Sequence, residues 1–315
     1  MTTPNVPAVH PELAEILANL PHRPGTFTDI EATRRNFRAV LDRLPLDTSR
    51  VEIRNLEIDG PDGNKIPVSV YRPKGVTGTL PAVLHIHGGS FAFGASLPGE
   101  DRTAIEIAEV VGAVAVSVDY RLAPEHPYPA GLEDCYATLE WMAAHAAELG
   151  IDTDRIAVTG KSAGGGLTAA MALLTRYRRG PAIAYQSLMI PTTDDRHDTE
   201  SGRSITDPRI LNDTDMRQTY RYYLRGTTDV PVYASPARAT DLSGLPPAFV
   251  LVCDMDPLRD EALDYARRLM DAGVPVTVRN VPGAWHLFEL HAARTRLART
   301  MIRGWLTDLR SALHD

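Results

Sequence analysis

The residues with the clearest chemical potential form a short motif in the middle of the chain, Gly160-Lys-Ser-Ala-Gly164. It fits the pattern Gly-x-Ser-x-Gly, in which a serine stands on a sharp turn between a strand and a helix. An apolar run at 156–158 precedes the motif, and a helical pattern at 167–174 follows it. Glycines on both sides of Ser162 remove Cβ atoms that would collide in so tight a turn. The sequence therefore predicts a nucleophilic serine at the start of a helix, whose positive end favours an oxyanion.

Two other interpretations of this motif compete with the first. Gly-Lys-Ser also ends a phosphate-binding loop, but that loop needs a glycine five residues before Gly160, where Arg155 stands. We therefore reject a phosphate-binding loop. The pattern Gly-x-Ser-x-Gly also occurs by chance in loops, so the argument depends on the strand before it and the helix after it.

A serine nucleophile needs a general base, which histidine most often provides. His286 directly follows a strand pattern at 274–281, whereas its rival His291 falls inside a predicted helix. We expect His286 to be the base, because its place at a strand end can bring it to the serine.

Three aspartates compete for the acid that orients this base: Asp254, Asp256 and Asp260. Asp256 precedes Pro257 and opens a predicted helix, so a simple capping role competes with a catalytic one. The residues favour Asp256 without excluding the other two.

A second glycine motif, which begins at His87, follows another strand pattern. Glycine lets the backbone approach a ligand closely. The N–H groups of Gly88 and Gly89, with that of Ala163, can therefore point at one oxygen and stabilise its negative charge. A plain glycine loop is the alternative. His85 and His87 share a strand face, but two ligands without a third do not make a zinc site.

Strand and helix patterns alternate along most of the chain, which indicates an α/β fold with a mostly parallel sheet and helices on both faces. We expect an edge hairpin at 51–58 and 66–71 and further strands at 81–87, 113–118, 156–158, 182–190, 247–253 and 274–281. We expect helices at 11–20, 29–44, 102–111, 132–149, 167–174, 213–224, 258–270 and from residue 290 onward. Ligands of such sheets bind beyond the carboxyl ends of the strands, where the serine, aspartate and histidine loops would meet.

The composition limits the classes of protein that need to be considered. The chain of 315 residues is 43% hydrophobic and 23% charged, as expected for a globular protein whose core needs no disulfide. Cys135 and Cys253 stand in apolar surroundings without metal-ligand spacing, so we expect buried free thiols and a cytoplasmic location. The net charge of −7 argues against nucleic acid as a partner. No stretch predicts a signal peptide or a membrane span, and we expect no cofactor and no metal.

In combination, these motifs resemble the hormone-sensitive-lipase family (bacterial family IV) of α/β-hydrolase carboxylesterases. The matching segments are His87-Gly-Gly, Asp119-Tyr-Arg-Leu-Ala-Pro-Glu125, Gly160-x-Ser-Ala-Gly-Gly165, Asp256-Pro-Leu-Arg-Asp-Glu261 and the loop that carries His286. They span nearly everything from Val51 to the C-terminus. Within the family, Gly164-Gly-Gly166 and Asp194-Asp-Arg196 resemble bacterial members that cleave acetyl esters, such as heroin esterase.

The resemblance implies an α/β-hydrolase fold with a helical cap. It implies roles for six residues: Ser162 as nucleophile, Asp256 as triad acid, His286 as base, and Gly88, Gly89 and Ala163 as oxyanion donors. It further implies that N-terminal helices within residues 1–50 and an insertion at about 191–226 form the cap over a catalytic domain of residues 51–315.

Three positions depart from the family pattern. Ser90 replaces the last glycine of His-Gly-Gly-Gly, Lys161 stands where the elbow usually has aspartate, and Leu287 replaces the glycine that usually follows the histidine. None removes a reacting group, so they bear on substrate range and efficiency. Lys161 could face the site and disfavour the imidazolium form of the base, or face away and pair with a surface carboxylate. We favour the second orientation, because burying an ammonium is costly.

The sequence thus predicts a serine hydrolase that cleaves short-chain carboxylic esters through an acyl-enzyme. Its expected partner is a small-molecule ester, and a homodimer is one assembly the chain could form. An amidase or lactonase with the same triad remains an alternative. A non-catalytic ligand receptor on the same fold is a second one, which we disfavour because such receptors lack the histidine that this chain has at His286.

Overall fold

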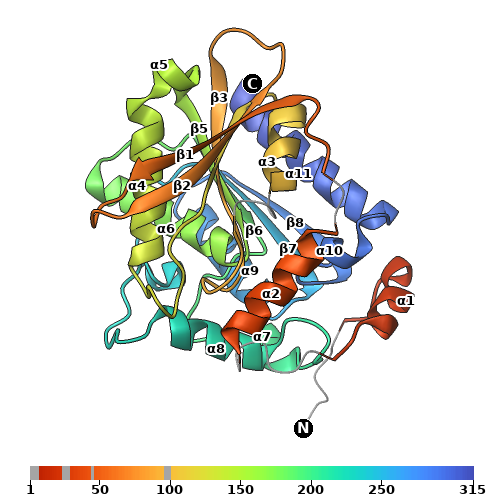
Figure 1. Ribbon diagram of the computed structural model, residues 1–315. Helices are drawn as coiled ribbons and strands as arrows, with labels where there is room; N and C mark the ends of the chain where they lie inside the picture. Colours follow the sequence, from red (N-terminus) through yellow and green to blue (C-terminus); the bar gives the residue numbers. More distant parts are fainter. Residues whose placement is uncertain (1–6, 23–28, 44–45, 96–100) are drawn as a thin grey trace.

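The computed structural model describes residues 7–22, 29–43, 46–95 and 101–315. An eight-stranded sheet forms its centre, in the order β1-β2-β4-β3-β5-β6-β7-β8 (Figure 1). The strands are β1 (Val51–Asp59), β2 (Lys65–Pro73), β3 (Leu80–Ile86), β4 (Val114–Val118), β5 (Ile151–Lys161), β6 (Tyr185–Met189), β7 (Ala248–Met255) and β8 (Val276–Trp285). β1 and β2 form an antiparallel hairpin at one edge, and β2 is also antiparallel to β4. From β4 to β8 all neighbouring strands are parallel.

Helices connect the parallel strands, as the alternating pattern predicted. The connecting helices are α3 (Asp101–Glu106) with a π-helical turn (Ile107–Val111), α4 (Ala130–Ala144), α5 (Ala146–Leu149), α6 (Ala163–Arg178), α7 (Glu200–Ser204), α8 (Asp213–Tyr223) and α9 (Arg259–Asp271). Helices α1 (Pro11–Asn19) and α2 (Ile30–Leu41) precede the sheet, and α10 (Glu289–Ala292) and α11 (Arg296–His314) follow it. In the described part of the chain, no helix has the length and apolarity that crossing a membrane requires.

Both faces of the central strands are buried, which is why these strands read as continuous apolar runs. On β3, Val83 belongs to one apolar cluster and Leu84 to the cluster on the opposite face. Ala157 and Val158 repeat this alternation on β5. Helices α3 and α11 contribute to the first cluster, and α4 and α6 to the second. The sheet is therefore held between two helical layers, which fixes the loops at its carboxyl edge.

The predicted final helix from residue 290 onward is wrong as a single element. The structure has a short helix α10 and a separate helix α11. The break comes at Thr295, whose Oγ1 accepts a hydrogen bond from the N–H of Ala298 at 3.2 Å. A threonine in this place starts a new helix by satisfying one of its free N–H groups. The predicted helix at 132–149 is likewise divided, at His145.

Several helices gather at one end of the sheet. In Figure 1, α2, α7 and α8 lie together at the end opposite α5, the helix that immediately precedes β5. This is the carboxyl end of the parallel strands. Helix α1 packs differently, since Leu13 and Leu17 are buried in the same apolar cluster as Trp285 and Trp305. The predicted helix at 29–44 is found as α2, although residue 44 lies outside the described residues.

Candidate active site

The motif around Ser162 forms the sharp turn that the sequence predicts. Ser162 lies between β5 and α6 with φ 55° and ψ −120°, a conformation that L-residues rarely adopt. Its N–H donates to the carbonyl of Met189 at 2.8 Å, which holds the turn against β6. A Cβ on Gly160 would lie 2.3 Å from the backbone of Gly164, so a side chain at Gly160 would collide with the turn. The glycines are thus required by packing.

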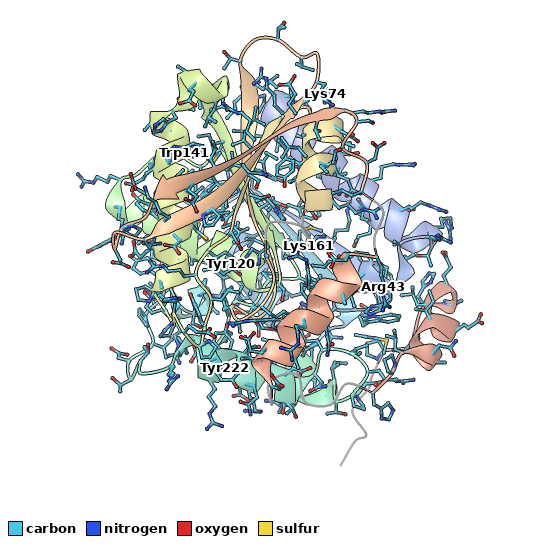
Figure 2. The ribbon with its side chains drawn as sticks, in the orientation of Figure 1. Arg43, Lys74, Tyr120, Trp141, Lys161 and Tyr222 are labelled. Carbon is cyan, nitrogen blue, oxygen red and sulfur yellow. The ribbon has the colours of Figure 1, made fainter. Side chains whose placement is uncertain are left out.

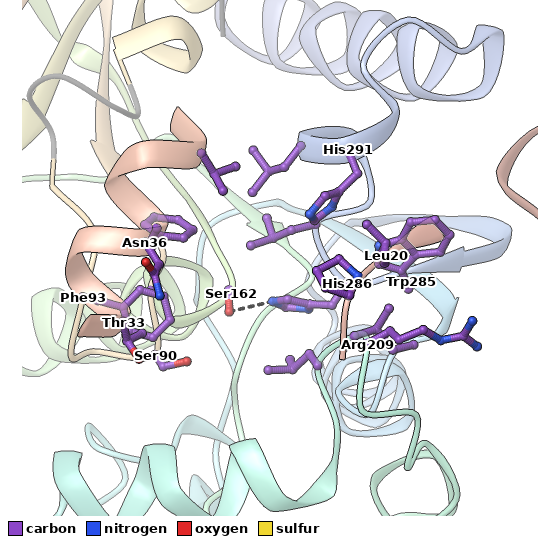
Figure 3. Close-up of a pocket in the computed structure, with 18 residues that line it drawn as sticks. Leu20, Thr33, Asn36, Ser90, Phe93, Ser162, Arg209, Trp285, His286 and His291 are labelled. Carbon is purple, nitrogen blue, oxygen red and sulfur yellow. Dashed lines mark hydrogen bonds between the residues drawn. The ribbon is translucent and has the colours of Figure 1, made fainter. Parts of the chain in front are cut away.

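Three side chains from three loops meet at this turn. The Nε2 atom of His286 lies 2.9 Å from Oγ of Ser162 (Figure 3). Its Nδ1 atom lies 2.7 Å from Oδ2 of Asp256. The other carboxylate oxygen of Asp256 accepts the N–H of Leu258 at 2.9 Å. Because the carboxylate accepts from Nδ1–H, Nε2 is left to accept the serine proton. All three side chains are buried, so the arrangement suits proton transfer from serine to histidine.

The other two aspartates have different partners. Asp254 accepts the N–H of Gly283 at 3.0 Å and so braces the histidine loop. Asp260 accepts the N–H of Ser201 at 2.7 Å and ties α9 to α7. Of the three aspartates that the sequence left open, Asp256 is the one that contacts His286.

The glycine loop after β3 lies directly against the serine turn. A Cβ on Gly88 would lie 2.9 Å from the carbonyl of Lys161, and Gly89 has φ +115° with its Cβ direction blocked by the carbonyl of Phe93 at 2.0 Å. Within the described part of the chain, neither glycine N–H donates to another backbone carbonyl. Both remain available, with the N–H of Ala163 at the first turn of α6, to bind an oxyanion.

The segment Asp119–Glu125 supports this glycine loop. The hydroxyl of Tyr120 donates to the carbonyl of His87 at 3.0 Å. The two rings are stacked with centroids 4.2 Å apart. The ring Nδ1 of His87 donates to the carbonyl of Gly88 at 2.7 Å. His87 therefore shapes the loop, and among the described residues no group of three or more histidines, cysteines and acids is arranged to hold a metal.

Two departures from the family pattern have the backbone conformation that glycine favours. Ser90 has φ 53° and Leu287 has φ 54°. For residues with a Cβ, this left-handed region costs about 1–2 kcal/mol. The chain therefore keeps the backbone shape of the glycines it lacks, with some strain at each position.

A cavity of about 280 Å³ opens onto Ser162 and His286. Its wall is mostly apolar and consists of Leu20, Pro21, Phe37, Val40, Phe93, Ile210, Leu211, Trp285, Leu287 and Leu290. The other residues that line the cavity are Thr33, Asn36, Gly89, Ser90, Arg209 and His291. In Figure 3, Thr33 and Asn36 lie on one side of Ser162, and Trp285 and His291 lie on the other. His291, the rival base, thus lines the cavity, while the histidine that is hydrogen-bonded to Ser162 is His286.

Sequence reasoning missed Arg34, which joins α2 to the loops beneath it. Its Nε donates to the carbonyl of Ala92 at 2.9 Å, and its Nη2 donates to the carbonyl of Ala123 at 3.2 Å. Its guanidinium also binds both carboxylate oxygens of Glu125, at 2.9 and 2.7 Å, and this contact lowers the pKa of that carboxyl group. A lone arginine in a helix carries no signature, so the sequence offered no signal beyond the unassigned glutamate of the Asp119–Glu125 motif.

We expect Arg34→Ala to lower kcat/KM by about tenfold, mainly through KM, because α2 supplies four of the residues that line the cavity. Arg34→Lys should recover only part of the loss, since an ammonium cannot replace a two-pronged guanidinium contact. The control is Arg35→Ala, which removes an equal charge from an exposed neighbour on the same helix. Equal kinetics for the two alanine variants would contradict a clamping role for Arg34.

The fold and the site place the chain among known proteins. Residues 83–290 match the α/β-hydrolase-fold family. The carboxylesterase NlhH of Mycobacterium tuberculosis is 39% identical over 324 residues, which cover all of both chains. An arylesterase of Saccharolobus solfataricus is 35% identical over 265 residues, which cover 82% of this chain and 84% of the relative. Among solved structures, a bacterial heroin esterase superimposes with a TM-score of 0.93 at 37% identity over the full length of both chains.

The chain belongs to the α/β-hydrolase family, in its hormone-sensitive-lipase branch. The predicted α/β fold is confirmed by this match and by the observed sheet. The predicted class of enzyme, a carboxylic-ester hydrolase, is confirmed by the relatives as well, since the three that are described here are all esterases.

Proposed function

We propose that Ser162, His286 and Asp256 are the catalytic triad of this ester hydrolase. The observation that supports the proposal is the chain of two hydrogen bonds, at 2.9 and 2.7 Å, that runs from serine through histidine to aspartate. Oγ of Ser162 attacks the ester carbonyl while Nε2 of His286 takes its proton. The carboxylate of Asp256 keeps the imidazole in the required tautomer and stabilises the imidazolium that forms.

The remaining steps use the same groups. The oxyanion accepts hydrogen bonds from the N–H groups of Gly88, Gly89 and Ala163, which stabilise charge where it develops. The imidazolium gives its proton to the departing alkoxide, and the product alcohol leaves an acyl-serine. A water molecule, deprotonated by His286, then attacks the acyl carbonyl, and the acid is released as Ser162 recovers its proton. These steps balance without a cofactor or a metal.

We also propose that the N-terminal helices within residues 1–50 and the segment at about 191–226 cap a catalytic domain of residues 51–315. Leu20 and Phe37 come from the first part of this cap, and Ile210 and Leu211 from the second, and all four line the cavity. The cap excludes water from the acyl group and limits its length. A cytoplasmic location is supported by the two buried free cysteines, and a homodimer remains a proposal from the sequence.

We expect esters of acetate and butyrate to be hydrolysed with higher kcat/KM than esters of long-chain acids. A cavity of about 280 Å³ closed by apolar side chains holds a short acyl group, whereas a long one would have to displace the cap. This preference is tested by steady-state kinetics on p-nitrophenyl esters whose acyl groups range from about two to about sixteen carbons. Faster turnover of the long-chain esters would contradict the proposed acyl site.

A further inference from the structure

Lys161 immediately precedes the nucleophile, and its side chain is largely buried. Its Nζ lies 3.5 Å from Oε1 of Glu289, with 13% of the lysine side chain and 9% of the glutamate side chain exposed. Nζ also donates to Oγ1 of Thr103 on α3 at 3.3 Å. The lysine does pair with a carboxylate, but the expectation of a surface partner is wrong because α3 and α10 cover this side of the turn. Figure 2 shows Lys161 near the centre of the molecule.

The ion pair connects two parts of the proposed site, because Glu289 lies close to His286 in the chain. Glu289 is the first residue of α10, three residues after His286. The pair therefore links the residue before the nucleophile to the loop that carries the base. Each of the two loops also holds a residue in a strained conformation, Ser162 with φ 55° and Leu287 with φ 54°. A strained turn persists only where surrounding contacts hold it in place.

The surroundings of the ion pair hold few groups that change charge near neutral pH. On β3, burial first and the Lys161 charge second lower the pKa of His85 to about 3. On β7, burial first and nearby carboxylates, Glu289 among them, raise the pKa of the Cys253 thiol. Neither group carries a charge between about pH 5 and pH 8. The ammonium and the carboxylate therefore balance each other in a region of low dielectric, where their attraction is strong.

We propose that Lys161 and Glu289 are positioning residues for the triad: their buried ion pair fixes the histidine loop against the serine turn. This inference rests on the proposed triad. A shift of about 1 Å between reacting groups can cost up to about a hundredfold in rate. The pair thus acts on kcat by keeping Nε2 of His286 within reach of Oγ of Ser162. Neither residue lines the described cavity, and so we expect substrate binding to change little.

The test compares Lys161→Met, Glu289→Gln and Lys161→Arg by kinetics on p-nitrophenyl acetate, with thermal unfolding as a check on folding. Both charge-removing variants are expected to lose about 10- to 100-fold in kcat, with KM within about twofold. Lys161→Arg keeps the charge and should retain kcat within about threefold. The double variant Lys161→Met/Glu289→Gln leaves no unpaired charge, and we expect a smaller loss than the two single losses combined.

A pH profile separates positioning from a general loss of structure. In Glu289→Gln the unbalanced Lys161 ammonium disfavours the imidazolium form of His286, so the acidic limb of kcat/KM should move to lower pH. In Lys161→Arg that limb should stay in place. If Lys161→Met does not fold, Glu289→Asp takes its place, because it keeps the charge but cannot span the present distance, and kcat should fall.

Two outcomes would overturn the inference. One is wild-type kcat and an unmoved acidic limb in folded Glu289→Gln and Lys161→Met. The other is a loss that falls on KM alone. Ser162→Ala, measured alongside, distinguishes this failure from failure of the triad, because an active Ser162→Ala variant would reject the triad itself.

Discussion

In the Ser162→Ala variant, kcat for a short-chain ester is expected to fall by several orders of magnitude, up to about 10⁶-fold. Alanine removes the atom that attacks the carbonyl and leaves the turn, the base and the oxyanion donors in place. The residual rate would come from substrate binding and the oxyanion donors alone. Steady-state kinetics on p-nitrophenyl acetate measures the effect, and circular dichroism establishes that the variant is folded.

The matched control is Ser90→Ala. Ser90 lines the same cavity and also has a positive φ. Each of the two variants therefore removes one serine hydroxyl group from the wall of this cavity. We expect Ser90→Ala to keep kcat/KM within about tenfold. Comparable losses in both variants would indicate damage to the cavity rather than removal of a nucleophile, and substantial activity in Ser162→Ala would reject the assignment.

The Asp256→Asn variant is expected to fold and to lose about 10⁴-fold in kcat. The asparagine oxygen can still accept the N–H of Leu258, which Oδ1 now accepts at 2.9 Å. Its amide nitrogen would then face Nδ1 of His286 and act as a donor. The imidazole would be held with its proton on Nε2, where it cannot accept the proton of Ser162.

Asp254→Asn is the control for this variant, because it makes the same change two residues earlier in the chain. Asp254 accepts from the backbone of the histidine loop, and an asparagine oxygen can keep that bond. Its kcat should fall by no more than about tenfold. A loss at Asp254 that equals the loss at Asp256 would contradict the choice of the acid.

The parts of the fold and site that the sequence predicts are those encoded locally. The strand before Ser162 and the helix after it lie next to each other in the chain. The glycines beside Ser162 are needed because Cβ atoms would collide in the tight turn between these two elements. The order of strands and helices likewise fixes which loops meet at the carboxyl edge of a parallel sheet. For this reason the six proposed site residues, named from the sequence, lie in four loops that the structure brings together.

What the sequence could not predict depends on contacts between distant segments. Arg34 binds Glu125 across 91 positions of the chain, and Lys161 meets Glu289 across an even longer separation. Neither pair leaves a periodic or local pattern. The expectation for Lys161 rested on the general cost of burying an ammonium, and it failed because a buried carboxylate compensates that cost. The break before α11 was missed because the apolar spacing continues across it.

The central claim, that Ser162 is the nucleophile of a serine esterase, is tested most directly by covalent labelling. The enzyme would be inactivated with a p-nitrophenyl alkylphosphonate, and the adduct located by peptide mass spectrometry. The account predicts one phosphonyl group per chain, bound to Ser162, formed in parallel with the loss of activity and absent in Ser162→Ala. An inactivated enzyme that carries the label on another residue, or an enzyme that hydrolyses esters and yet takes up no label, would contradict it.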